Sequence, residues 1–491
     1  MKKISLFVFI IAALSSSCTK EFLDKAPISN ISTNNFYKTA DDITTAVNGA
    51  YAALKLNGQY QYYYTYGELS TDNILNVGGV QDQKDFGLFN LQPANSYIAA
   101  AWADNYNGIS RCNTILNRID AVPMDADLKS RYIGEVKFLR ALMYFNLVRY
   151  FGDVPLVLTE ITSPNQGYDY ARVPKADVYA QIIKDLNDAD AALPAPPYNA
   201  ADLGRATKGA AKAILGKVYL TQRNFSAAAT KLKEVIDLNV YDLMPNYADV
   251  FKAATENGKE MIFSVQYKSG LGGQGSPFSN YYAPPGSGTY VSISPPLGNV
   301  IVNDDIFNAY ESGDTRKAAS VSKTYIGAGG ATVTLPNAFS KKFPDPSATQ
   351  YDSDNNWIVI RYADVLLMYA EALNEVSYQA NGDAFFYYNK VRTRAIPGGA
   401  KTATDLPDQG SFRLAIEAER RVELAFEGHR WFDLLRTNRA LTILNAKAAA
   451  LNILGNDASG KIDSHNLLFP IPQDQVRISN GKITQNPGYP N

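Results

Sequence analysis

Apolar residues in the first half of the chain recur every three or four positions, which is the spacing of one helix face. The clearest stripe follows Thr39 and consists of Ile43, Ala46, Val47, Ala50, Tyr51 and Leu54. Thr39 can cap this helix with Asp42 three residues later, and Asn57-Gly58 ends it. The pattern therefore predicts a helix that ends just before the segment Gln59–Asn73.

Three further helices are predicted between this segment and residue 193, over residues 101–120, 135–152 and 176–193. The first of them places Trp102 on its apolar face. The second is apolar on nearly every side, which is typical of a deeply buried helix. The sequence thus begins as a bundle of long helices.

Residues 206–238 form a repeat-like unit. Leu215, Gly216 and Tyr219 match one half of the tetratricopeptide pattern, and Ala228 and Leu232 match the other half. Small residues at these positions let two antiparallel helices approach closely, and such pairs bury their faces by stacking on neighbours. Residues 361–375 and 383–395 are predicted to form a second, degenerate pair.

The last strongly periodic helix lies within residues 411–436. Its pattern predicts Leu414, Ala418, Val422 and Phe426 on the inward face. Together these segments predict a mainly α protein with a scaffold of tetratricopeptide-like helical hairpins. The remainder is predicted to be irregular and rich in loops.

The longest of these loops is Ser269–Asn303, which contains no charged residue and is rich in Gly, Pro, Ser and Tyr. Loops of this length are usually functional or disordered. The aromatic residues Phe278, Tyr281, Tyr282 and Tyr290 favour order, because disordered segments are poor in aromatics. The loop is therefore a candidate binding region.

Five tyrosines occupy the seven residues Tyr60–Tyr66. A helix or a strand would direct some of these rings toward water. One interpretation is a platform on which ligands stack. In a second, Tyr60 and Tyr66 pack on the helices and only one or two rings are free; in a third, the cluster contacts a partner protein.

Composition excludes several classes of function. Apolar residues make up 46% of the 491 residues and charged residues 19%, which indicates a globular chain. The formal net charge is −1, so no electrostatic signature of nucleic-acid binding is present. The two histidines and two cysteines form no metal-binding or nucleophile motif, and no phosphate-binding loop follows a strand. The sequence predicts no metal, no cofactor and no catalytic residue.

Carboxylates one helical turn apart are the remaining candidates for catalysis. Glu371 and Glu375 form one such pair, and Glu423 and Glu427 form another. Ion pairing between helices is the first interpretation. A glycosidase dyad is the alternative, and it would require two carboxylates that face each other across a cleft.

The N-terminus is predicted to be a lipoprotein signal peptide. Lys2 and Lys3 precede an apolar run, Ile4–Leu14, which is too short to span a bilayer. Small residues then lead to Cys18, which would become the lipidated first residue of the mature chain. An ordinary secretory signal with an incidental cysteine is the alternative.

Several segments together resemble the SusD/RagB family. They are SCTKEFLDKAP near the N-terminus, VKFLRALMYFNLVRYFGDVPLV, RYADVLLMYAEALNE, ERRVELAFEGHRWFDLLR and LLFPIPQDQVRISNGKITQNPGY at the C-terminus. They run in family order over nearly the whole mature chain. The resemblance implies that four residues are scaffold residues that hold helices together: Arg361, Glu427, Arg430 and Trp431.

The resemblance implies a SusD-like α/α superhelix with a signal peptide over residues 1–17, an N-terminal helical region over 18–260 and a C-terminal region over 261–491. It implies a non-catalytic lipoprotein at the surface of the outer membrane. Such a protein binds an oligosaccharide, or in some members a peptide, and delivers it to a SusC-like TonB-dependent transporter. A secreted glycan-degrading enzyme is the third hypothesis.

The loops supply the predicted ligand contacts. Sugar rings stack on aromatic faces, and their hydroxyls pair with amide and carboxylate groups, so tyrosine suits both needs. The predicted contacts are Tyr62, Tyr63, Tyr64, Asp72, Asn73, Asn76, Phe278, Tyr281, Tyr282 and Tyr290.

Overall fold

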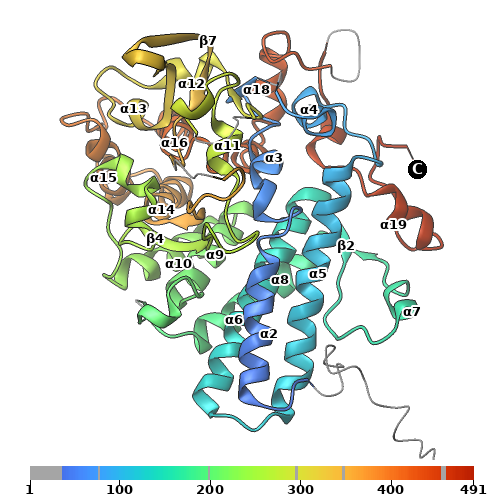
Figure 1. Ribbon diagram of the computed structural model, residues 1–491. Helices are drawn as coiled ribbons and strands as arrows, with labels where there is room; N and C mark the ends of the chain where they lie inside the picture. Colours follow the sequence, from blue (N-terminus) through green and yellow to red (C-terminus); the bar gives the residue numbers. More distant parts are fainter. Residues whose placement is uncertain are drawn as a thin grey trace, which may run out of the picture.

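The computed structural model describes residues 36–75, 78–196, 199–292, 297–344, 349–454 and 460–490 (Figure 1). The mainly helical prediction is confirmed. The long helices of the first half are α2 (Ala40–Ala53), α5 (Ser96–Arg118), α6 (Ala126–Phe151), α8 (Lys175–Ala192), α9 (Lys208–Thr221) and α10 (Phe225–Asp237). Those of the second half are α14 (Tyr362–Val376), α15 (Asp383–Ala395), α16 (Gln409–Glu423), α17 (Arg430–Arg436) and α18 (Ala440–Ala446).

Shorter helices lie in the connecting segments. They are α3 (Tyr63–Gly67), α4 (Gln81–Leu88), α7 (Pro164–Gly167), α11 (Phe278–Tyr282), α12 (Asp304–Ala309), α13 (Arg316–Ser320) and α19 (Gln473–Ile478). Two of them, α3 and α11, carry most of the tyrosines singled out in the sequence. Figure 1 places α3 and α11 next to each other above the end of α2.

Helix α2 begins where the sequence predicts. Thr39 Oγ1 accepts a hydrogen bond from Asp42 N, and the Asp42 carboxylate accepts one from Thr39 N, which completes a capping box. Helices α2, α5, α6 and α8 then pack side by side (Figure 1). Helix α6 is buried along most of its length, as predicted, and Trp102 on α5 is also buried.

The repeat-like unit folds as the antiparallel pair α9 and α10. Gly216 of α9 faces Leu232 of α10 so closely that a Cβ at position 216 would lie 2.7 Å from Leu232 Cγ. Helices α14 and α15 form the second predicted pair, and α14 packs on α10. The helical pairs therefore connect the two halves of the chain. The predicted boundary between residues 260 and 261 falls at the start of β4 and stays a prediction.

Three small antiparallel sheets complete the described structure. The largest has the strand order β1 (Ile74–Leu75), β5 (Ile301–Val302), β7 (Thr332–Ser340) and β6 (Val321–Ile326). β2 (Val154–Pro155) pairs with β3 (Arg172–Val173), and β4 (Met261–Val265) pairs with β8 (Trp357–Arg361). Because β1 directly follows the tyrosine-rich segment, the first sheet attaches that segment to the second half of the chain.

The predicted inward face of α16 is partly wrong. Leu414 is 52% exposed and Ala418 is also exposed, whereas Val422 is buried and Phe426, beyond the end of the helix, is buried. The buried face instead carries Phe412, Ile416, Glu419, Arg420 and Glu423. Three of these residues are charged, so the apolar pattern points to the wrong side of the helix.

The buried charges of α16 belong to a network of ion pairs. Arg361 donates to Glu423 Oε1 at 2.6 Å and to Glu427 Oε2 at 2.7 Å, and all three side chains are buried. A buried guanidinium needs such partners because an unpaired charge in the interior is very costly. The scaffold role expected for Arg361, Glu427 and Trp431 agrees with this packing, since Trp431 is buried as well.

Candidate ligand-binding site

The tyrosine-rich segment forms a 3₁₀ turn, Tyr60–Tyr62, followed by α3. Consecutive residues of a helical turn point in different directions, so the rings divide between the interior and the surface. Tyr60, Tyr64 and Tyr66 are buried, and Tyr63 is nearly so. Tyr62 alone among the five is partly exposed. The second of the three interpretations, in which few rings are free, fits this burial.

Tyr62 belongs to a cluster of four tyrosines from different segments, Tyr62, Tyr97, Tyr281 and Tyr351, which we term the tyrosine platform. Tyr62, Tyr97 and Tyr351 are partly or largely exposed, whereas Tyr281 is only 3% exposed. The Tyr62 and Tyr281 rings stack with centroids 5.6 Å apart, and Tyr97 meets the Tyr62 ring edge-on at 5.3 Å. The Tyr351 ring lies 5.9 Å from that of Tyr281. The platform thus joins the two loop regions that the sequence predicts for ligand binding.

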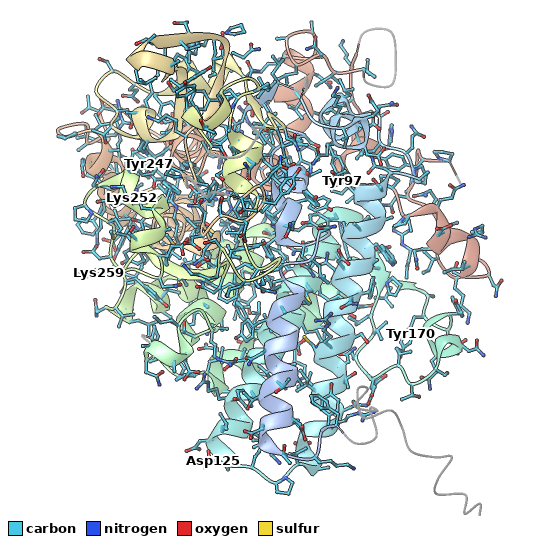
Figure 2. The ribbon with its side chains drawn as sticks, viewed as in Figure 1. Tyr97, Asp125, Tyr170, Tyr247, Lys252 and Lys259 are labelled. Carbon is cyan, nitrogen blue, oxygen red and sulfur yellow. The ribbon has the colours of Figure 1, made fainter. Side chains whose placement is uncertain are left out.

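The start of α5 positions Tyr97 (Figure 2). Asn95 caps this helix, and its Oδ1 accepts hydrogen bonds from Tyr97 N at 3.0 Å and Ile98 N at 3.3 Å. The buried Tyr66 hydroxyl donates to Tyr97 O at 3.1 Å. Partial burial raises the pKa of Tyr97, so its hydroxyl stays protonated at neutral pH.

Tyr351 has a strained backbone. Its φ is 62°, a value that bulky residues rarely adopt, and its side chain is 41% exposed. The Tyr351 amide donates to Asn280 Oδ1 of the buried helix α11 at 2.9 Å, which holds this conformation. Strain at an exposed aromatic residue is the kind of outlier that accompanies binding sites.

A buried aromatic layer supports the platform. The Tyr64 hydroxyl accepts hydrogen bonds from Gln83 Nε2 at 2.6 Å and Asn299 Nδ2 at 3.1 Å. The Tyr282 hydroxyl donates to Phe426 O at 3.0 Å. Because these phenols lie in the interior, desolvation raises the pKa values of both. Tyr64 and Tyr282 therefore position the platform and have no surface to offer a ligand.

The predictions for Tyr63 and Phe278 need the same correction. The Tyr63 hydroxyl accepts a hydrogen bond from Arg149 at 2.9 Å. Phe278 is fully buried, with its ring centroid 4.9 Å from that of Trp357. Both rings fill the core between the helices and β8, so neither is available for stacking.

Asp72 and Asn73 are also buried, and their polar atoms are used within the protein. Asp72 pairs with Arg430 at 2.8 Å and Arg421 at 3.1 Å. Asn73 Oδ1 accepts a hydrogen bond from Arg421 Nε at 2.8 Å. Burial acts to raise the pKa of Asp72, but Arg430 and Arg421 hold it well below its usual range. These residues connect the tyrosine-rich segment to the C-terminal helices, which corrects their predicted role as ligand contacts.

The remaining predicted residues have different environments. Tyr290 is 54% exposed on a 3₁₀ turn, so it is available to a ligand or a partner. Asn76 and Cys18 lie outside the described residues. Tyr62 is partly exposed and stays a predicted ligand contact. Tyr281 is buried, so its ring supports Tyr62 and Tyr351 within the platform, which corrects its predicted role as a ligand contact.

Sequence reasoning missed Tyr97 and Tyr351. Tyr97 follows the helix-capping residue Asn95, and Tyr351 stands in a polar turn just before Asp352. An isolated aromatic residue beside a cap or within a polar turn is a usable signal for an exposed ring. Only the fold, however, brings these two beside Tyr62 and Tyr281.

The carboxylate pairs support the ion-pair interpretation. Glu371 pairs with Arg436, and Glu375 accepts from Arg413 at 2.8 Å. Glu423 and Glu427 both pair with Arg361, as described above. Among the described residues, no group of three or more His, Cys, Asp or Glu side chains is arranged to hold a metal ion.

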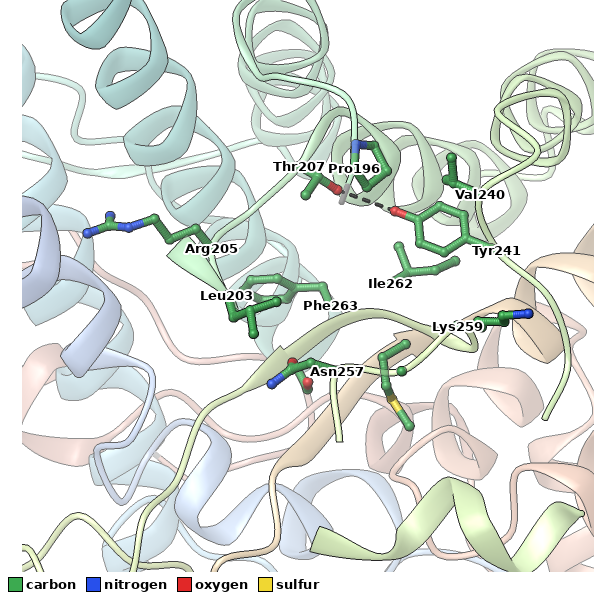
Figure 3. Close-up of a pocket in the computed structure, with 14 residues that line it drawn as sticks. Pro196, Leu203, Arg205, Thr207, Val240, Tyr241, Asn257, Lys259, Ile262 and Phe263 are labelled. Atoms are coloured by element: carbon green, nitrogen blue, oxygen red, sulfur yellow. Dashed lines mark hydrogen bonds between the residues drawn. The ribbon is translucent and has the colours of Figure 1, made fainter. Parts of the chain in front are cut away.

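A cavity of about 380 Å³ lies beside β4, between the segment that precedes α9 and the segment that follows α10 (Figure 3). Leu203 and Phe263 line its floor, and the Tyr241 hydroxyl lies 3.3 Å from Thr207 Oγ1 at the opposite wall. A second cavity, of about 420 Å³, shares Leu203, Arg205 and Phe263 with the first. The two cavities are therefore adjacent, and residues of β4 line both of them.

The fold and the platform define a class of protein: a helical-hairpin scaffold that presents aromatic side chains from its loops. Comparison with known families then identifies the chain. Residues 278–489 match the SusD family, and residues 21–220 match a SusD-like family described as starch-binding and associating with the outer membrane. The chain belongs to the SusD family, and the SusD-like fold predicted from the sequence is confirmed.

Individual relatives agree with this assignment. SusD-like protein P25 from Formosa agariphila is 27% identical over 98% of this chain and 97% of its own length. A solved laminarin-binding SusD-like protein has a TM-score of 0.77 and 28% identity, over 92% of this chain and all of its own. A SusD homolog from Bacteroides thetaiotaomicron has a TM-score of 0.82 and 25% identity, over 94% of this chain and 99% of its own. None of the helices in the described ranges is long and apolar enough to cross a membrane.

Proposed function

We propose that this protein is a non-catalytic binding protein for an oligosaccharide. The observation that carries the proposal is the tyrosine platform. Three partly exposed rings with polar tips, Tyr62, Tyr97 and Tyr351, cluster with the buried Tyr281 ring, and buried hydrogen bonds hold the layer beneath them. Such rings stack on the C–H faces of sugars while their hydroxyls bond to sugar hydroxyls, and little rotamer freedom is lost on binding.

Two further observations support this function. The family description includes starch binding, and one similar structure is a laminarin-binding protein. The carboxylate pairs that could serve a glycosidase are instead engaged with arginines. Binding without hydrolysis is therefore the expected activity.

The cellular role is proposed on the same basis. Lipidation of Cys18 would hold the protein in the outer membrane, with its platform facing outward. There it would deliver bound oligosaccharide to a SusC-like TonB-dependent transporter. Replacement of Cys18 by alanine is expected to release the protein from the membrane fraction, and mass spectrometry of the native N-terminus tests the lipid directly.

Calorimetry on the soluble chain from Thr19 onward tests the central proposal. The panel contains laminarin oligosaccharides, starch oligosaccharides and unrelated peptides. Binding of a saccharide without the appearance of reducing ends supports the proposal. Binding of peptides alone would replace it with peptide uptake, and release of new reducing ends would replace it with an enzyme.

A further inference from the structure

The second cavity, which we term the Lys55 cavity, has a polar wall. Asn48 and Lys55 border it from α2 and the loop that follows, and Gln266 and Gln274 border it from the segment after β4. Its volume of about 420 Å³ is sufficient for a sugar unit. The Gln266 amide is already bonded to Asn257 and Asn356, and Asn48 Oδ1 accepts a hydrogen bond from Arg205, so these two amides shape the wall.

Two cationic side chains line this cavity, and one of them is neutralised within the protein. Arg205 donates to Glu135 Oε2 at 2.8 Å and to Asn48 Oδ1 at 2.6 Å. Its guanidinium also lies 5.6 Å from the centroid of the Tyr51 ring. Arg205 is therefore a structural cation with its partners in place.

Lys55 is different. Its ammonium donates to Gln274 Oε1 and lies 5.8 Å from the centroid of the Tyr267 ring, and no carboxylate of the described residues lies within 4 Å of it. Partial burial lowers the pKa of Lys55. A half-buried cation with only an amide and a ring as neighbours has unused capacity to bind an anion. By contrast, Lys268 on the neighbouring loop is 3.0 Å from Asp354.

The Lys55 cavity and the tyrosine platform are structurally linked. Lys55 lies in the short loop between α2 and the turn that carries Tyr62, and Tyr60 N donates back to Leu54 O at 3.0 Å. On the other side, the segment after Gln274 pairs with the segment after Tyr351 through the Ser276–Ser353 bridge. The cavity and the platform therefore lie on directly connected segments.

We infer that the Lys55 cavity is a subsite for an oxyanion carried on a sugar ring, and hence that the bound glycan is acidic. The inference rests on the proposed function and adds the ligand class. The Lys55 ammonium would pair with the oxyanion, and Asn48 and Gln266 border the space for the rest of the ring. A carboxylate of a uronic acid and a sulfate ester share this chemistry.

The test uses the soluble chain from Thr19 onward and three ligands: a neutral gluco-oligosaccharide, the same oligosaccharide bearing sulfate esters, and an oligouronate. Wild-type protein is expected to bind at least one acidic ligand more tightly than the neutral one. Lys55→Gln is expected to weaken that binding about tenfold, because a charge-assisted hydrogen bond is lost, and so to remove the preference for the acidic ligand over the neutral one. Lys55→Arg keeps the positive charge and should preserve the preference for the acidic ligand over the neutral one.

Lys268→Gln is the matched control, because it removes the same charge from a neighbouring exposed lysine that already has a partner. It should leave the affinity for acidic ligands within about twofold of wild type. The sulfated and uronate arms distinguish the two sources of the oxyanion.

The outcomes separate this inference from the proposed function. If Lys55→Gln and Lys268→Gln lose the same affinity for acidic ligands, the effect is a general one of net charge, and the inference is overturned. Preference of wild-type protein for the neutral ligand would overturn it as well, while the proposed function would stand. Failure to bind any saccharide would overturn both.

Discussion

The ring of Tyr62 stacks on the ring of Tyr281 at a centroid distance of 5.6 Å and an interplanar angle of 30°. The two residues lie in different halves of the chain. Tyr281 also contacts Tyr64 of the buried layer at 5.1 Å, so the surface platform is anchored to the interior. Aromatic pairs of this geometry stabilise by about 0.5–1.5 kcal/mol beyond their buried area.

The platform is expected to account for saccharide binding. Tyr62→Ala and Tyr351→Ala should each lower the affinity about 3- to 10-fold, the loss expected from one stacking contact. Tyr351 is 41% exposed, so Tyr351→Ala should change the free energy of unfolding little, whereas Tyr62→Ala also removes the contact with the Tyr281 ring and should lower it by about 0.5–1.5 kcal/mol. Calorimetry measures the affinity, and denaturant titration measures the stability.

Phe386→Ala is the control for this experiment, because Phe386 is 63% exposed on α15, outside the platform. Its affinity should equal that of wild type. If both tyrosine variants bind the saccharide with wild-type affinity, the binding site lies outside the platform.

Two glycines in helices are expected to respond oppositely to alanine. At Gly216 the added methyl group would lie 2.7 Å from Leu232 Cγ, so the α9–α10 pair must separate or repack. Gly216→Ala should lower the free energy of unfolding by about 1 kcal/mol or more. A methyl group added at Gly49 in α2 would meet no atom within 4 Å, so Gly49→Ala should raise it by about 0.5–1 kcal/mol. A rise in the free energy of unfolding for Gly216→Ala would contradict the close packing of the pair.

The orientation of α16 can be tested by a pair of substitutions. Phe412 is fully buried, and the centroid of its ring lies 4.3 Å from that of Phe385. Phe412→Ala should therefore lower the free energy of unfolding by about 3–5 kcal/mol. Leu414→Glu introduces a charge on the exposed side and should change stability by less than about 0.5 kcal/mol. A large loss of stability in Leu414→Glu would show instead that Leu414 lies on the inward face, as the sequence predicts.

Glu68 gives the protein a specific dependence on pH. Its carboxyl group is buried in the interior and accepts a hydrogen bond from Gly428 N at 2.9 Å. Desolvation raises the pKa of Glu68 to about 8, far above its unfolded value of about 4.3. The folded state therefore keeps a proton that the unfolded state releases, and this contribution to stability is lost as the pH rises through 8.

Glu68→Gln removes that titration and keeps the shape of the side chain. Between about pH 5 and pH 8 the free energy of unfolding of wild type should fall relative to the variant, at up to ~1.4 kcal/mol per pH unit. Denaturant titrations at three pH values measure the difference. Parallel pH profiles for the two proteins would show that Glu68 is ionised in the folded state.

Helix positions were largely predictable because they depend on local patterns. The Thr39 cap, the apolar α6 and the small residues of the α9–α10 pair are signals carried by neighbouring residues, and the structure has helices at all three places. The pattern failed at α16, where Glu419, Arg420 and Glu423 face the interior. A charged residue is expected outside unless its partners are known, and those partners come from distant segments.

The candidate site was predictable only in part. The sequence by itself determined the family, the helical scaffold and the concentration of tyrosines in two segments, since all three are properties of residue order. Tertiary structure alone decided that Tyr64 and Tyr282 are buried, that Asp72 is held by Arg430, and that Tyr97 and Tyr351 complete a platform. The physical reason is that burial and pairing depend on contacts between segments far apart in the chain, which local periodicity does not encode.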